Sequence, residues 1–408
     1  MRSTRATAAT DQTMVRRINE LLILEHMRGR DGLPLSDVSK ETGLSWRTTN
    51  LVAEDLVAAG WLRETAPAAS GVRAGRPART FQFAADVGHI AAIDIGSGTV
   101  SVTIADLAGE VLQRAQQDVP PGADATVRIA AVADTMSGAL SRAGLESEAI
   151  WSTTVATSGV VDPAGTIAKS VVLPGWDGRN LGDELGRQFH GRTRVENDCN
   201  LAALAEHWYG QRSDDLIYLL IGTRLGVGLI LHGELHRGAS GAAGEIGEIP
   251  ELGWNSAAQL LAAALPSANT VDRDLAAAAV FEAARIGDQV AVAAVDTFVD
   301  KVARGLIAMV LTIDPAAVVL GGSFTHAADL LIPRLNEHLR RSSVRAPVVS
   351  RSRLGDDAVE LGALRLALDA VLTSISSLDS ATPLTPMTVR NLLAYDGTPA
   401  TTAAFNTT

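Results

Sequence analysis

The sequence predicts an α/β protein in which a small helical head precedes a body of two lobes. Three observations support this class. Residues 13–60 hold helical patterns separated by glycines, residues 89–118 hold three short strand patterns in succession, and residues 256–373 hold alanine- and leucine-rich helical patterns around one buried strand. A chain of 408 residues has room for two or three domains. We expect a disordered arm at 1–11, the head at 12–84, a first lobe at 88–200, a second lobe at 201–373 and a disordered tail at 374–408.

The charge of the chain is unevenly distributed. Residues 1–83 contain 12 Lys and Arg against 9 Asp and Glu, or +3, which leaves 23 against 37, or −14, for the remainder. A mildly basic head on an acidic body is typical of a nucleic-acid-binding domain joined to a sensing or catalytic body.

Composition also limits the class of protein. The single cysteine, Cys199, excludes a disulfide within the chain and a zinc site with several thiolate ligands. No apolar run approaches the roughly 18 residues of a membrane span, and the first residues lack the apolar core of a signal peptide. We therefore expect a cytoplasmic protein that does not contact membranes.

The head contains two short helices in close succession. After a first helical pattern from Thr13, Pro34 opens a short helix that Gly43 ends, and Ser45 is a suitable N-cap for the next helix. In that helix we expect Leu51, Val52, Leu56 and Val57 to face inward, and Trp46, Arg47, Thr49 and Asn50 to face outward. Polar side chains on the first turns of the second helix predict a helix-turn-helix.

A basic extension follows these helices. Residues 61–63 and 80–83 read as two strands, and the loop between them carries Arg73, Arg76 and Arg79 among glycines. Cationic side chains on such a loop can reach phosphates or a minor groove. The head is therefore predicted to be a winged helix-turn-helix that binds DNA through Ser45, Trp46, Arg47, Thr49, Asn50 and these arginines. The alternative is a small protein-interaction module with a solvated basic loop.

The first lobe begins with strands at 90–95, 99–106 and from Val111, followed by a helix at 123–144, a strand at 149–161 and a helix at 181–190. Asp94 ends the first strand and precedes a Gly-Ser-Gly turn. That arrangement suits a phosphate or magnesium ion beside backbone N–H groups.

The second lobe opens with a glycine-rich hairpin. Two apolar runs, 217–221 and 229–231, flank a turn that holds Gly222, Gly226 and Gly228. Glu245 and Glu248 follow in a small-residue setting that would suit a ligand with hydroxyl groups; alternatively, the stretch only turns the chain. Helical patterns then lie at 256–264, 273–286, 287–312 and 358–373, with a buried strand at 316–320 before Gly321-Gly322. Whether the last helix returns to the first lobe stays open.

These motifs resemble the ROK family (repressors, open reading frames and sugar kinases), and within it the regulators that join a winged helix-turn-helix to a sugar-kinase-like body. The likeness covers residues 13–372. It rests on TGLSWRTTNLVAEDLVAAGWL and AGRPARTFQF in the head, and on AIDIGSGTVSVTIADLAGEV, VENDCNLAALAEHWYG, IGTRLGVGLILHGELHRGASGAAGEIGE and VVLGGSF in the body. The resemblance implies a two-lobed actin/hexokinase-like (ribonuclease H-like) body.

The resemblance also implies a ligand site. Asn197 and Asp198 match the family's sugar-binding asparagine and its catalytic base, Glu245 matches a glutamate that binds sugar hydroxyls, and Gly175 lies on a sugar-contacting loop. A carboxylate beside a sugar hydroxyl accepts its proton during phosphoryl transfer, or else simply hydrogen-bonds it. The alternative is that Asn197 and Asp198 only cap the following helix.

Departures from the family pattern point away from catalysis. Glu248 stands where the family has a histidine that contacts sugar and ligates zinc, and the cysteine-rich zinc loop is missing. Gly98 stands where a threonine is usual, and Arg224 and Val227 replace glycines that admit ATP phosphates. We therefore expect no metal, no cofactor and no working catalytic residue, with Asp198 as a degenerate kinase base.

The sequence thus predicts a DNA-binding transcriptional regulator, most simply a repressor of carbohydrate-related genes, that senses a sugar or sugar derivative. Two heads on a homodimer or homotetramer would read operator DNA. Two alternatives remain: a sugar kinase with an appended DNA-binding head, and a regulator whose body serves only to dimerise.

Overall fold

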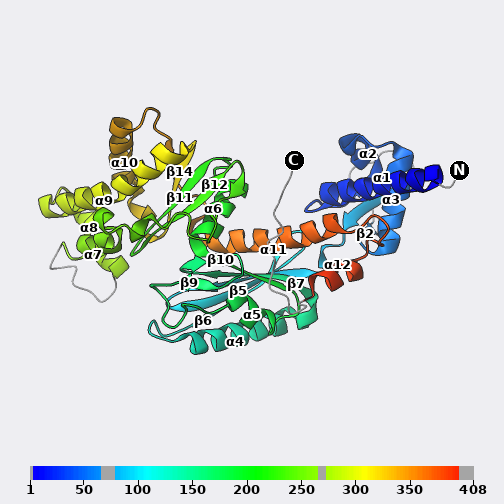
Figure 1. Cartoon of the computed structure of the whole chain (residues 1–408), viewed down its shortest axis with the longest axis horizontal. Helices are drawn as coiled ribbons and strands as arrows, with labels where there is room; N and C mark the ends of the chain where they lie inside the picture. The colour runs from blue at the N-terminus through cyan, green and yellow to red at the C-terminus, as the bar shows by residue number, and fades with distance from the viewer. Residues whose placement is uncertain (1–2, 66–78, 265–272, 395–408) are drawn as a thin grey trace, which may run out of the picture. The chain divides into compact units, whose positions relative to one another are not determined.

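The structure, a computed structural model, describes residues 3–65, 79–264 and 273–394, without the side chains of residues 3–11 (Figure 1). The chain divides into two compact units, each assembled from separate stretches. The first unit contains the residues up to Val155, Leu181–Arg194 and the described residues from Leu364 onward. The second contains Ala156–Asn180 and Val195–Ala363. No helix in the described part of the chain is long and apolar enough to cross a membrane.

The head is a winged helix-turn-helix. Its elements are α1 (Ser3–Met27), β1 (Leu33–Pro34), α2 (Leu35–Thr42), α3 (Trp46–Ala59), β2 (Leu62–Thr65) and β3 (Thr80–Phe83). The three strands form an antiparallel sheet in the order β1-β3-β2. Gly43 and Gly60 adopt left-handed φ values of 74° and 92°, which end α2 and α3 at little steric cost. The predicted fold class is confirmed for this part of the chain.

Trp61 lies at the base of the head. It is fully buried, its ring stacks on Phe83 with centroids 6.2 Å apart, and it meets Trp151 edge to face at 6.1 Å. Its indole N–H donates to the main-chain oxygen of Leu384 over 3.0 Å. The buried ring therefore joins the head to two other segments of the first unit, and its polar atom is satisfied.

The predicted disordered tail at 374–408 is instead ordered over residues 374–394, and residues 395–408 lie outside the described part of the chain. The helix α11 (Ala358–Ser377) continues through its start, and α12 (Pro386–Leu393) follows. Thr385 caps α12 by accepting from the N–H of Thr388, and Pro386 occupies the first helical position. This order has a physical reason: the side chains of Leu384, Val389 and Leu393 are buried, and burial of their apolar area stabilises the segment. The many Ser and Thr residues around them made the segment look too polar to fold.

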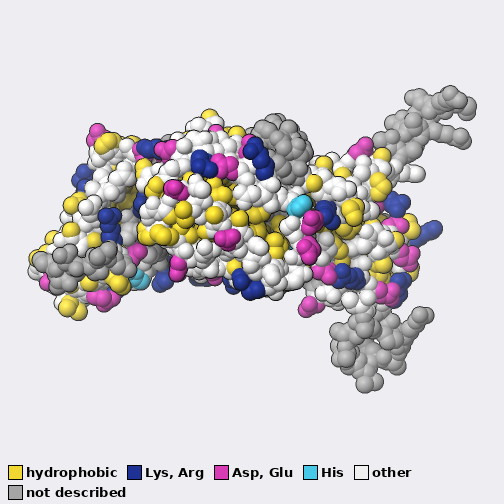
Figure 2. Space-filling model, turned by 90° about the horizontal axis from the view of Figure 1, so that it is seen from below, with side chains coloured by type: hydrophobic (Ala, Val, Ile, Leu, Met, Phe, Trp, Pro, Cys, Tyr) yellow, Lys and Arg dark blue, Asp and Glu magenta, His cyan; other side chains and the backbone are white. Residues whose placement is uncertain are grey.

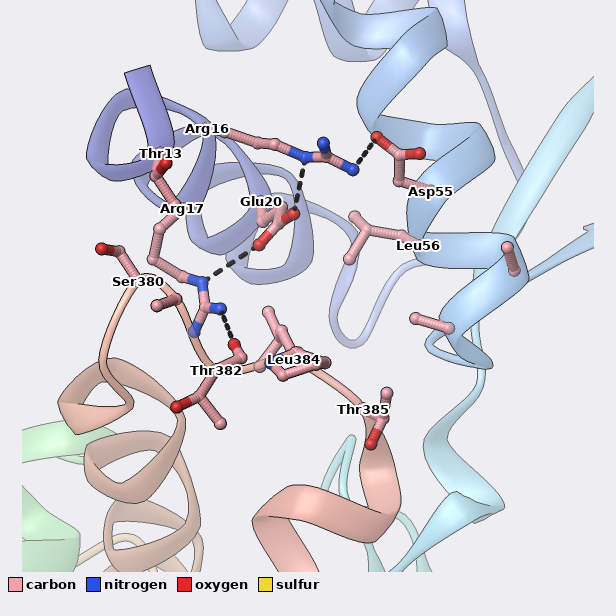
Figure 3. A pocket seen from close by; sticks show the side chains of 14 residues that line it. Thr13, Arg16, Arg17, Glu20, Asp55, Leu56, Ser380, Thr382, Leu384 and Thr385 are labelled. Atoms are coloured by element: carbon pink, nitrogen blue, oxygen red, sulfur yellow. Dashed lines mark hydrogen bonds and ion pairs between the residues drawn. The ribbon is translucent and has the colours of Figure 1, made fainter. Parts of the chain in front are cut away.

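Residues 380–385 lie against the head. Together with residues of α1 and α3 they line a pocket of about 280 Å³ (Figure 3). Arg17, 5% exposed, donates from Nη2 to the main-chain oxygen of Thr382 over 2.6 Å and from Nε to Glu20 over 3.1 Å. The helix α1 that carries Arg17 begins at Ser3, so the structure also differs from the predicted disordered arm at 1–11. The alanines and the absence of Gly and Pro in residues 3–11 favour helix there.

The first lobe is built on a five-stranded sheet in the order β10-β7-β4-β5-β6. Its elements are β4 (His89–Ile95), β5 (Thr99–Asp106), β6 (Val111–Asp118), α4 (Ala125–Ala143), β7 (Ile150–Thr157), α5 (Leu181–Gly186) and β10 (Arg192–Asn197). The buried Arg128 of α4 donates to the main-chain oxygens of Gly96 (2.6 Å) and Ser97 (2.8 Å). The Gly-Ser-Gly turn after Asp94 is therefore anchored through its carbonyl groups.

The second lobe is built on another five-stranded sheet, in the order β13-β12-β11-β14-β15. Its strands are β11 (Leu216–Ile221), β12 (Leu225–Leu231), β13 (Glu234–Leu235), β14 (Ala317–Gly321) and β15 (Val348–Arg351); its helices are α6 (Asp198–Trp208), α7 (Trp254–Ala262), α8 (Arg273–Arg285), α9 (Gln289–Ile313) and α10 (Ala328–Ser342). A core that includes Phe298, Leu306 and Phe324 lies between the sheet and α7 to α10. On the face of the molecule seen in Figure 2, acidic and basic side chains are interspersed, so no large area of one sign appears there.

Candidate functional site

Asn197 and Asp198 lie where β10 passes into α6, within the second unit. The Asn197 side chain is the N-cap: its oxygen accepts from the N–H groups of Cys199 (2.9 Å) and Asn200 (3.1 Å). Its amide nitrogen donates to the main-chain oxygen of Gly159 over 3.0 Å. The structure therefore gives Asn197 the capping role, and its side chain fixes the position of Asp198 beside it.

Asp198 is the carboxylate at the start of α6. One of its oxygens accepts from the Cys199 N–H over 2.8 Å. Burial raises the pKa of Asp198, while the Cys199 N–H and the positive charge of Arg224 act in the opposite direction. A partly desolvated carboxylate at this position can accept a hydrogen bond from a ligand hydroxyl.

Glu245 and Glu248 lie in a tight turn at η3 (Ile246–Glu248), where the Glu248 N–H donates to the Glu245 oxygen over 3.2 Å. Loss of hydration raises the pKa of Glu245, and the charges of Glu248 and Asp198 raise it further. The negative charges of Glu245 and Asp198 therefore act on each other. Gly244, at φ 92°, allows this approach, since a Cβ there would lie 2.8 Å from the Val227 main-chain oxygen.

Lys169 also belongs to the site, although the sequence did not indicate it. It ends β9 (Ile167–Lys169), which pairs with β8 (Val160–Val161), and its ammonium group forms an ion pair with Glu248. The hydrogen bond with Glu248 raises the pKa of Lys169. At the position where a zinc-ligating histidine was expected from the family pattern, the chain thus has a carboxylate neutralised by a lysine.

Gly175 lies in a loop that is held in place by its neighbours. It has a left-handed φ of 74°, and the next residue, Trp176, is fully buried and donates from its indole N–H to the Thr157 hydroxyl over 2.8 Å. Asp177 accepts from the Ser170 N–H over 2.7 Å, one residue after Lys169. These bonds give the Gly175 turn and the end of β9 a defined arrangement.

The glycine-rich hairpin packs against α6. A Cβ at Gly226 would lie 2.5 Å from the sulfur of Cys199, and one at Gly228 would lie 2.2 Å from the Cys199 main-chain oxygen. These glycines are therefore required for close packing of β12 on the first turn of α6. Arg224 stands just before β12 with an exposed side chain, and its charge interacts with Asp198.

The candidate DNA-binding residues lie mostly at the start of α3. Trp46 is 62% exposed, Arg47 is exposed, and Ser45 caps the helix by accepting from the Thr48 N–H over 3.1 Å. Asn50 donates to Glu54 over 3.0 Å. Arg79 forms a bidentate pair with Glu64, both bonds at 2.8 Å, at the base of the wing. Arg73 and Arg76 fall outside the described residues.

Two orientations predicted for α3 are wrong. Thr49 is fully buried and donates its hydroxyl to the Ser45 main-chain oxygen over 3.1 Å, so its side chain does not face outward. Leu51, predicted to face inward, is 59% exposed. The buried face of α3 consists of Thr49, Val52, Ala53 and Leu56, which follow the i, i+3, i+4, i+7 spacing of a helix. Leu51 and Glu54, neither of which was predicted to face outward, lie on the exposed surface instead.

In comparisons with known proteins, a family model matches the body, and curated relatives align either with most of the chain or with about the length of the body. The family model described as "ROK family" matches residues 90–252 and 258–370. A xylose repressor of Caldicellulosiruptor bescii is 24% identical over 395 residues, covering 89% of this chain and 98% of the repressor. A glucokinase of Thermotoga maritima is 27% identical over 316 residues, covering 68% of this chain and 97% of the kinase.

A solved structure has a similar fold over nearly the whole chain. It is a ROK family transcriptional regulator, described as a homologue of the E. coli MLC protein, with a TM-score of 0.68 and 19% identity. The match covers 92% of this chain and 99% of that structure. The similarity includes the head as well as the body, whereas the glucokinase matches only about the length of the body.

Proposed function

This chain belongs to the ROK family, and on that premise we propose that it is a DNA-binding transcriptional repressor of sugar-related genes. One observation carries the proposal: a winged helix-turn-helix with an exposed Trp46-Arg47 pair precedes a ROK body, and repressor relatives align over 89% of the chain. A kinase needs no such head. The head and the body together therefore favour regulation over metabolism.

The head would place the first turns of α3 in the major groove. Arg47 and Trp46 are the exposed side chains there, and Asn50 would exchange its bond with Glu54 for a base edge. Arg79 would stand beside the DNA backbone while its bond with Glu64 holds it in place. Arg73 and Arg76 would add phosphate contacts from the wing.

One head would bind weakly. Its excess of three positive charges is small, and several of its arginines are paired with carboxylates, such as Arg63 with Asp86 and Arg30 with Glu41. Affinity for DNA rises steeply with the number of phosphates neutralised. We therefore propose a homodimer or homotetramer whose two heads read a pseudo-palindromic operator.

The second unit would bind the effector, a sugar or sugar derivative. Asp198, Glu245 and Glu248 supply acceptors for hydroxyl groups, and Asn197 and Gly175 hold the segments that carry the site. Glu248 is paired with Lys169, which supports a site without zinc. Arg224, in the turn where ATP phosphates would lie, supports the absence of ATP binding.

The retained Asp198 supports a second candidate, a sugar kinase with a DNA-binding head. The glucokinase relative at 27% identity is consistent with it. The two candidates are separated by incubating the full chain with ATP, magnesium, D-glucose or D-xylose, and by testing the same preparation for binding to genomic DNA fragments. Specific DNA binding without Asp198-dependent turnover supports the regulator; turnover that Asp198→Asn abolishes supports the kinase.

A further inference from the structure

The pocket beside α1, here the head pocket, is enclosed by three separate stretches of the first unit (Figure 3). They are α1, the end of α3 and residues 380–385. Arg16 of α1 forms an ion pair with Asp55 of α3 at 2.7 Å. Glu20 lies between two arginines of its own helix, Arg16 at 3.3 Å and Arg17 at 3.1 Å. The walls that α1 and α3 contribute are therefore tied to each other by charged groups.

Arg17 lines the head pocket with a guanidinium group whose hydrogen bonds are incomplete. The residue is 5% exposed, its Nε donates to Glu20, and its Nη2 donates to the main-chain oxygen of Thr382 over 2.6 Å. Its Nη1 is buried and has no hydrogen-bond partner among the described residues. A buried donor without an acceptor has lost its hydration with nothing in exchange. An acceptor group bound in the head pocket would remove that cost.

A second buried arginine of the same unit shows that this fold can satisfy such a group by itself. Arg128 is fully buried, and each of its three nitrogens donates to at least one main-chain oxygen. The Nε donates to Ala123, Nη1 to Gly96 and Nη2 to Ser97. An open position on a buried guanidinium group is therefore particular to Arg17, the arginine that lines a pocket.

The lining of the head pocket indicates which class of ligand would fit. Its four charged residues balance, because Arg16 and Arg17 are matched by Glu20 and Asp55, and each carboxylate already pairs with an arginine. An ionic ligand would find no unused counter-charge, so a neutral one is favoured. Carboxylate oxygens and guanidinium N–H groups stand side by side, which suits hydroxyl groups because a hydroxyl both donates and accepts.

We propose that the head pocket is a second small-molecule site, which takes a neutral ligand rich in hydroxyl groups and uses Arg17 Nη1 as its buried donor. A volume of about 280 Å³ suits a ligand smaller than a typical drug molecule, of about monosaccharide size. This site is separate from the candidate effector site, since Asp198 and Glu245 belong to the second unit. A bound ligand would contact α1, α3 and residues 380–385 together, and would stabilise the head by binding only its folded form.

Titration calorimetry of the full-length protein tests the proposal. The neutral probes are D-glucose, D-xylose and myo-inositol; D-glucuronate and D-glucosamine are the anionic and cationic counterparts. Arg17→Gln removes the donor but also the bonds to Glu20 and Thr382, so a second variant, Ala58→Leu, fills the pocket from an exposed position that lines it. Ala130→Leu, at an exposed position of α4, is the matched control. Asp198→Asn reports on the candidate effector site.

We expect at least one neutral probe to show a binding step that Ala58→Leu weakens roughly tenfold or more and that Arg17→Gln removes. Ala130→Leu and Asp198→Asn should leave this step unchanged. The charged probes should bind at this step more weakly than the neutral one, because the charges of the lining are already balanced.

Two outcomes would overturn the proposal as a whole. One is that no neutral probe binds, in which case water is the acceptor for Arg17. The other is that every binding step survives in Ala58→Leu, which would place all binding outside the head pocket. Tighter binding of D-glucuronate at the affected step would overturn the neutral class of ligand. Each of these results is obtained without DNA, so the proposed function is tested independently.

Discussion

Trp61 donates its indole N–H to the main-chain oxygen of Leu384, a residue 323 positions later in the chain. The C-terminal segment is therefore part of the structure that supports the helix-turn-helix head. Gly60 lies close to the same segment: a Cβ atom at Gly60 would be 3.9 Å from the Cγ atom of Pro386. The helix α11 begins in the second unit and continues into the first, and this segment follows it in the chain.

Replacement of Trp61 by phenylalanine should destabilise the head. The variant removes the hydrogen bond and leaves the Leu384 oxygen buried, which costs about 1–3 kcal/mol, and the smaller ring adds a cavity cost. Urea unfolding followed by circular dichroism measures the loss. Trp46→Phe is the matched control, because Trp46 is 62% exposed and should change stability by less than about 0.5 kcal/mol. Equal effects of the two variants would contradict the structural role of Trp61.

Arg47→Ala should weaken operator binding without destabilising the head, because the side chain is exposed. A lost base contact costs about 1–3 kcal/mol per head, whereas a lost phosphate contact lowers the salt dependence by about one charge. Fluorescence anisotropy at several salt concentrations separates these cases. Thr49→Ala should behave oppositely, lowering stability while leaving the salt dependence unchanged. An Arg47→Ala protein with normal affinity would remove Arg47 from the interface.

Asp198→Asn should stabilise the protein at neutral pH. Burial raises the folded-state pKa of Asp198 above its unfolded value, so the folded state holds this proton more tightly and its charged form is disfavoured. The gain from Asn should be largest above the folded pKa and should shrink as the pH falls through it, because the native carboxyl is then neutral as well. Urea unfolding at pH 7.5 and pH 4.5 measures the difference. The exposed Asp118→Asn is the control; a gain that grows at low pH would contradict the sign.

Lys169→Met should change effector binding more than stability. The Lys169–Glu248 pair is solvent-exposed, so it contributes little to the free energy of unfolding. Glu248 without its partner would become a free acceptor beside Glu245 and raise the local negative charge. We expect a changed affinity for sugars, measured by calorimetry. The double variant Lys169→Met/Glu248→Gln should recover part of it, and no recovery would place Lys169 in direct ligand contact instead.

Local patterns in the sequence predicted most of the fold. Glycines at 43 and 60, the Ser45 cap and the alternating strands of the two sheets have physical signals that extend over a few residues. The exception was which face of α3 is buried. Thr49 is polar, but its hydroxyl donates to the main-chain oxygen of Ser45 in the preceding turn, so the side chain can be buried. The order of the C-terminal segment was missed because three apolar side chains stand among Ser, Thr and Pro.

The candidate site was only partly predictable, because its partners are distant in the chain. Lys169 and Glu248 are 79 residues apart, and no local pattern connects them. Arg224 was visible as a departure from a glycine motif, but its interaction with Asp198, 26 residues earlier, has no local pattern. Likewise, the glycines of the hairpin were interpreted as room for a ligand, whereas the structure shows that Gly226 and Gly228 make room for Cys199 of α6.

Selection of genomic DNA fragments on the full-length protein, repeated with and without sugars and their phosphate esters, tests the central claim most directly. The account predicts that a small set of fragments with pseudo-palindromic sites is enriched, and that one ligand class lowers the enrichment. Failure to enrich any specific fragment under every condition would contradict the assignment of this chain as a DNA-binding regulator.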